Sequence, residues 1–115
     1  MSITSHMEGD ICIIQIQSGL SSELHIFLKE KLRELVRNGS VKIILDLSRA
    51  GFVSSSLIGA MVYGLKEVRK KKGDLILAEV DEAFMDVLRV TRLDQAFISF
   101  ETVEEATKNG FKSAS

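Results

Sequence analysis

The sequence has no proline among its 115 residues and only one cysteine, Cys12. A lone cysteine cannot form an intrachain disulfide or a cysteine-based zinc site. Because Cys12 lies inside the apolar segment ICIIQIQ, we expect it to be a small buried hydrophobic side chain in a strand. Without proline, low-complexity linkers or internal repeats, the sequence predicts a single domain over residues 1–115, with a flexible tail at 111–115.

An excess of charge of one sign is also missing. Lys and Arg number 15 against 16 Asp and Glu, so the net charge is −1 and nothing favours nucleic acid as a partner. No stretch approaches the roughly 20 apolar residues that a membrane span needs. The N-terminal segment MSITSHMEGD lacks the apolar core of a signal peptide. We therefore expect a cytoplasmic protein with no membrane span and no nucleic acid partner.

Motifs for catalysis are missing as well. The sequence has no G-x-S-x-G, no H-E-x-x-H and no phosphate-binding loop. A serine nucleophile needs a neighbouring base, but His6 lies in a predicted edge region and His25 at the surface of a predicted helix. Asp46, at the end of a strand, is expected to accept hydrogen bonds from backbone N–H groups in a turn. The sequence therefore predicts no enzyme, no metal site and no cofactor.

What the sequence does contain is an alternation of β-rich and helical segments. The predicted strands are a weaker one at 3–7, then 11–17, 41–47, 74–78 and a buried one at 96–100. The predicted helices are 23–37, one from the serines 54–56 to KKKG at 70–73, 81–90 and 102–110. This order implies an α/β fold class with a mixed, mostly parallel sheet of about five strands and about four helices.

Several residues are expected to begin or end these helices. Ser21 or Ser22 can cap the first helix, which ends at Asn38-Gly39. Asp81 caps the third helix, and Thr102 with Glu105 stands at capping-box spacing before the fourth. Gly110 is expected to end that last helix in a left-handed conformation.

Three serines, Ser54, Ser55 and Ser56, stand between the strand at 41–47 and the second helix. The first N–H groups of a helix are unpaired and carry a partial positive charge, so a serine there can cap them. A phosphate on such a serine would be stabilised by the same groups. The following LIGA contains no acidic residue, and Gly59 leaves the helix surface open to close approach. Capping and phosphorylation both fit this position.

The segment VKIILDLSRAGFVSSSLIGAMV resembles the signature of the STAS domain family, which includes the bacterial anti-sigma factor antagonists. RVTRLDQAFISFETVEEA is similar to the family's ending, so the resemblance covers nearly the whole chain. It implies a STAS-like single domain that binds an anti-sigma factor which is also a serine kinase. In such antagonists the kinase phosphorylates the serine after a motif Asp and thereby ends binding, and a phosphatase reverses this. The equivalent serine here is Ser55, with Ser54 and Ser56 as alternatives.

The resemblance also implies a partner-binding surface, formed by Ser54, Ser55, Ser56, Leu57 and Gly59. The sequence departs from the family pattern at two of these positions: Ser54 replaces the motif Asp, and Leu57 replaces a Gly. Because the carboxylate beside the target hydroxyl is gone, a second interpretation stays open. In that interpretation the chain is a STAS interaction scaffold without phosphorylation, in a signalling or transport assembly.

Overall fold

The structure, a computed structural model, describes residues 3–17, 23–51 and 53–111. Within these residues the chain forms five strands and four α-helices, which confirms the predicted α/β class. The strands are β1 (Ile3–Glu8), β2 (Ile11–Gln17), β3 (Lys42–Arg49), β4 (Asp74–Ala78) and β5 (Ser99–Phe100). The helices are α1 (Leu24–Arg37), α2 (Ser55–Lys70), α3 (Glu82–Val90) and α4 (Val103–Asn109), with a short 3-10 helix at Leu93–Gln95.

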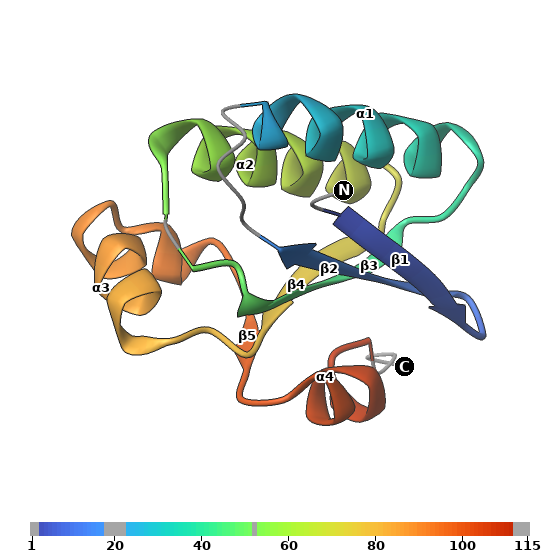
Figure 1. Ribbon diagram of the computed structural model, residues 1–115. Coiled ribbons are helices and arrows are strands. Elements are labelled where there is room, and N and C mark those ends of the chain that lie inside the picture. Colours follow the sequence, from blue (N-terminus) through green and yellow to red (C-terminus); the bar gives the residue numbers. More distant parts are fainter. Residues whose placement is uncertain (1–2, 18–22, 52, 112–115) are drawn as a thin grey trace.

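The sheet has the strand order β1-β2-β3-β4-β5 (Figure 1). β1 and β2 form an antiparallel hairpin, and the other neighbouring strands are parallel, which confirms the predicted mixed, mostly parallel sheet. Helices α1 and α2 lie on one face of the sheet and α4 on the other (Figure 1). Alternate residues of β2 therefore enter two cores: Cys12 and Ile14 join the cluster with α1 and α2, whereas Ile11 and Ile13 pack with Ala106 of α4.

Helix α1 buries one stripe of leucines, at the three- and four-residue spacing that predicted it: Leu24, Leu28, Leu32 and Leu35. It ends at Asn38-Gly39 as predicted. Gly39 has a left-handed φ of 85°, its N–H donates to the Val36 carbonyl, and the next N–H donates to the Leu35 carbonyl. At the other end Glu23 holds the capping position, and the predicted caps Ser21 and Ser22 lie outside the described residues.

Two predictions near the C-terminus are wrong. The strand expected at 96–100 is reduced to Ser99–Phe100, because the N–H groups of Ala96 and Phe97 both donate to the Leu93 carbonyl in a helical turn. Ser99 is exposed, so this strand is not buried as expected. Gly110 is right-handed, with φ −71° and ψ −27°, not left-handed. A Cβ on this glycine would lie 2.6 Å from the backbone carbonyl oxygen of Ala106 and 2.6 Å from Cδ1 of Ile76, so the position needs glycine for close packing on the sheet.

The remaining helix caps are confirmed. The Asp81 carboxylate accepts a hydrogen bond from the Phe84 N–H at 2.8 Å, and α3 begins at the next residue, Glu82. The Thr102 hydroxyl accepts from the Glu105 N–H at 3.0 Å and starts α4. These side chains accept hydrogen bonds from N–H groups that have no partner within the helix, and they thereby fix the residue at which each helix begins.

Candidate partner-binding and phosphorylation site

The candidate site begins where β3 ends. Asp46 lies near that end, and its Oδ1 accepts a hydrogen bond from the Ser48 N–H at 3.0 Å. Its Oδ2 accepts a second one from Nε2 of Gln15 on β2 at 3.1 Å. Both carboxylate oxygens are thus used to hold the backbone and the neighbouring strand. Asp46 therefore accepts a backbone N–H as predicted, but it does so within β3 and not in a turn, because β3 continues to Arg49.

Ser54 is the residue that caps α2. Its backbone is extended, with φ −113° and ψ 155°, and its Oγ accepts a hydrogen bond from the Leu57 N–H at 3.1 Å. The side chain is half-buried at this position. The Ser54 hydroxyl therefore acts as the N-cap of α2.

Ser55 and Ser56 are the first two residues of α2 and are both exposed. Among the hydrogen bonds of the described residues, none involves either of their hydroxyls. The first turn of α2 contains no acidic side chain. A negative charge attached to Ser55 or Ser56 would therefore lie close to unpaired N–H groups and would meet no carboxylate within that turn.

The two other predicted contact residues lie in different environments. The Leu57 side chain is only 2% exposed and belongs to the core, so it anchors the first turn of α2. Gly59 is exposed, and a Cβ built on it would meet nothing within 4 Å. Because Ser55, Gly59 and Val62 are spaced by four and three residues, they lie along one side of α2. Val62 is half-buried, and Lys66, four residues further along the same side, is exposed.

The opposite side of α2 is occupied by α1. The Tyr63 ring lies under two cations of α1, with Nζ of Lys29 4.8 Å and Cζ of Arg33 5.7 Å from its centroid. Nε of Arg33 also donates to the Tyr63 hydroxyl at 3.3 Å. Met61 and Leu65 are buried in the core. This contact between the two helices leaves the Ser55 side of α2 as the side open to a partner.

An exposed apolar surface on α3 was not anticipated from the sequence. Val90 is 85% exposed, and together with Asp86, Val87 and Thr91 it lines a shallow pocket. α3 lies at the same end of the molecule as the start of α2 (Figure 1). Its buried side chains, Phe84 and Leu88, are four residues apart, so the helical spacing could have revealed that Val87 and Val90 face elsewhere.

Titratable groups add little chemistry to this region. Burial raises the pKa of the Cys12 thiol, which keeps it neutral inside the core. His6 is exposed, with its Nε2 3.7 Å from Glu8, and His25 is half-buried. Within the described ranges, no cluster of three or more His, Cys, Asp or Glu is arranged to hold a metal ion. In the same ranges, no helix has the length and apolar character to cross a membrane.

Comparison with known proteins identifies the family of this chain. The sequence model of the STAS domain family matches residues 2–106, so the chain belongs to this family. A curated relative, BtrV of Bordetella bronchiseptica, is named as a candidate anti-sigma factor antagonist. It is 26% identical over 117 residues, which cover 99% of this chain and 97% of BtrV.

Solved structures agree with this assignment. TM1081 of Thermotoga maritima, described as a candidate anti-sigma factor antagonist, is 26% identical, with a TM-score of 0.85 over 92% of each chain. SpoIIAA of Bacillus in its phosphorylated form is 20% identical, with a TM-score of 0.76 over 94% of this chain and 98% of its own. Its unphosphorylated form is 17% identical, with a TM-score of 0.77 over 94% and 96%. The SpoIIAA matches show the common fold alone.

Proposed function

We propose that this STAS domain is an anti-sigma factor antagonist whose partner is both an anti-sigma factor and a serine kinase. The unphosphorylated chain binds the partner, phosphorylation of Ser55 ends binding, and a phosphatase restores it. The chain acts in the cytoplasm as a single domain over residues 1–115, without enzymatic activity of its own. One observation carries the proposal: Ser54 supplies the cap, which leaves the next hydroxyl exposed and, among the described residues, without a hydrogen-bond partner. The names of BtrV and TM1081 support the anti-sigma factor as partner.

Ser55 fits the switch better than its two neighbours. A phosphate on Ser54 would change the atom that accepts from the Leu57 N–H, and it would do so at a half-buried position. Ser56 is exposed, but the residue seven positions after it, Tyr63, contacts Lys29 and Arg33 of α1. The residue seven positions after Ser55 is Val62, so Ser55 lies further from α1 and is the serine that we expect a docking partner to reach.

The physical effect of phosphorylation supports a switch at this position. The surface around Ser55 is uncharged in the first turn, and Gly59 leaves room for a partner's backbone. A phosphate adds about −1.5 to −2 charges, which a docking partner would have to desolvate or oppose. The N–H groups at the start of α2 would stabilise the same phosphate, so the fold itself is kept. SpoIIAA likewise has one fold in its phosphorylated and unphosphorylated forms.

The test is intact-mass analysis after incubation with ATP and candidate anti-sigma kinases from the same genome, followed by mapping of the modified residue. We expect one added phosphate on Ser55. Ser55→Ala should abolish incorporation, whereas the matched variant Ser56→Ala should keep it. Calorimetry should then detect the complex with unphosphorylated chain and not with the phosphorylated chain. Unchanged incorporation in Ser55→Ala would show that the assignment to Ser55 is wrong.

A second candidate function is a STAS scaffold that binds its partner without a switch. The observation that favours it is Ser54 itself, which caps α2 but lacks the carboxylate found at this position of the family motif. A kinase that recognises that carboxylate would not modify this chain. The same experiment separates the two functions, because stable complex formation without phosphate incorporation would identify the scaffold.

A further inference from the structure

The outer edge of β1 is open to another strand. β1 is the first strand of the sheet, and it pairs with β2 through six consecutive residue pairs without a bulge. Its sequence, ITSHME, contains neither lysine nor proline, and every residue after Ile3 is exposed. Edge strands are usually protected by charge, proline, bulges or a covering segment. Within β1 no bulge, lysine or proline protects the edge, and its one carboxylate, Glu8, lies at the last position, so the outward N–H and C=O groups of residues 3–7 can accept a further strand.

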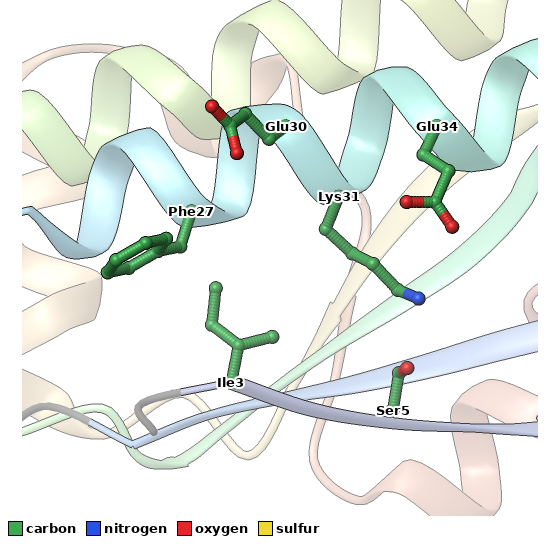
Figure 2. A pocket seen from close by; sticks show the side chains of 6 residues that line it. All are labelled: Ile3, Ser5, Phe27, Glu30, Lys31 and Glu34. Atoms are coloured by element: carbon green, nitrogen blue, oxygen red, sulfur yellow. The ribbon is translucent and has the colours of Figure 1, made fainter.

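A pocket lies directly beside this edge. It has a volume of about 290 Å³ and is lined by Ile3 and Ser5 of β1 and by Phe27, Glu30, Lys31 and Glu34 of α1. In Figure 2 the Ile3 side chain points from the strand toward α1, and the Phe27 ring lies at one end of the pocket. Phe27 is 40% exposed although it is aromatic. The pocket therefore offers a partly exposed apolar contact next to an edge of β1 with which no other described strand pairs.

The charged side chains around the pocket indicate which kind of partner can bind there. Glu30 and Glu34 are one helical turn apart on α1, and among the described residues Lys31 is the only cation that lines the pocket. Two carboxylates against one ammonium favour a basic side chain. A second copy of this chain paired through β1 would instead bring its own α1 to the same face, with Glu30 and Glu34 approaching their counterparts. Repulsion between these carboxylates disfavours self-association at this edge.

We propose that β1 and this pocket bind an extended segment of a partner protein by strand addition. An apolar side chain of the segment lies between Ile3 and Phe27, and a lysine or arginine of the segment lies against Glu30 and Glu34. Backbone pairing with the strand supplies affinity, and the pocket supplies sequence preference. This surface is separate from the proposed Ser55 site, because the described residues that line the pocket lie on β1 and α1, whereas Ser55 begins α2.

The test is an NMR titration of the full chain with a short blocked peptide in which threonine alternates with leucine and arginine. We expect saturable amide shifts in β1 and α1, and nuclear Overhauser contacts between the peptide backbone and β1. Glu30→Gln combined with Glu34→Gln should weaken binding about 3- to 10-fold, the loss of two exposed charge contacts. The matched control, Glu104→Gln with Glu105→Gln on α4, should bind as the wild type does, and so should chain phosphorylated on Ser55.

Three results would overturn the proposal. The first is the absence of saturable shifts in β1 at millimolar peptide. The second is unchanged affinity in the Glu30 and Glu34 variant while its circular dichroism spectrum stays that of the wild type. The third is a concentration-dependent dimer whose formation shifts the β1 amides without peptide, which would assign the edge to a second copy. Because Ser55 takes no part in the titration, failure here leaves the phosphorylation switch untouched.

Discussion

Replacing Ser54 by alanine should destabilise the protein through the start of α2. The variant loses the oxygen that accepts from the Leu57 N–H, and removal of such a cap costs about 0.5–2 kcal/mol. Leu57 is almost fully buried and Ser54 half-buried, so water replaces the lost oxygen poorly. We therefore expect a loss of about 1–1.5 kcal/mol. Ser55→Ala should stay within about 0.5 kcal/mol of wild type, since the hydroxyl it removes makes no hydrogen bond among the described residues.

The free energy of unfolding of both variants can be measured by urea unfolding, followed by circular dichroism. A loss of about 1 kcal/mol lowers the melting temperature of a domain of this size by roughly 3–6 °C. The control is Ser54→Asp, which keeps an acceptor oxygen and adds a charge that suits the helix start, so its stability should equal or slightly exceed that of wild type. If Ser54→Ala were as stable as wild type, or Ser54→Asp as unstable as the alanine variant, the division of roles between Ser54 and Ser55 would be refuted.

Three further predictions concern the switch, the glycines and the core. Ser55→Asp should weaken partner binding in calorimetry yet leave the melting temperature unchanged or higher, because its charge suits the start of α2; unchanged affinity would count against the electrostatic switch. Gly59→Ala should stabilise by about 0.5–1 kcal/mol in urea unfolding, since a Cβ there meets nothing within 4 Å. Gly73→Ala should lower the free energy of unfolding by at least ~2 kcal/mol, because its Cβ would clash with the Val41 carbonyl oxygen. Equal stability of the Gly59→Ala and Gly73→Ala variants would contradict both predictions. Burial raises the Cys12 pKa, so the folded state holds the thiol proton more tightly than the unfolded chain. The free energy of unfolding therefore keeps its full value below the ordinary thiol pKa and falls as the pH rises above that pKa. Between pH 7 and about 9.5 the free energy of unfolding of the wild type should fall more than that of Cys12→Ala. Parallel pH profiles of the two proteins would argue against this account.

Most of the fold could be predicted because its elements have strong local signals. β2 and β4 are short apolar runs bounded by turn residues, and their observed ends coincide with the predicted ones. The prediction of a strand at 96–100 failed because tertiary contacts determine the backbone conformation there. The turn at Arg92, left-handed with φ 62°, draws the N–H groups of Ala96 and Phe97 to the Leu93 carbonyl. Nothing in AFISF alone indicates that its first residues belong to this turn.

Some features of the candidate site could likewise be predicted from the sequence, and others could not. Its place at the start of α2 followed from an apolar strand, a serine triplet and a helical stripe. Which serine caps depends on whether α2 begins one residue earlier or later, and the sequence pattern does not resolve that step. The Tyr63 contact with Lys29 and Arg33 joins two helices, and the pocket joins β1 to α1. Such neighbours are set by packing, so they become visible only in the folded chain.

The substitution at Ser54 has different consequences for structure and for charge. Serine and aspartate are about equally good helix caps, so this position can exchange one for the other without moving the start of α2. The charge beside Ser55 nevertheless changes by one. With the family's motif Asp the unmodified site would already be anionic, whereas here the first turn of α2 has no acidic side chain until a phosphate arrives. In a switched antagonist the change from neutral to about −2 is then the entire signal. In a scaffold the same neutral turn is a permanent docking surface. Because both functions need the same cap, the stability of this chain cannot separate them, and only phosphate transfer and partner affinity can.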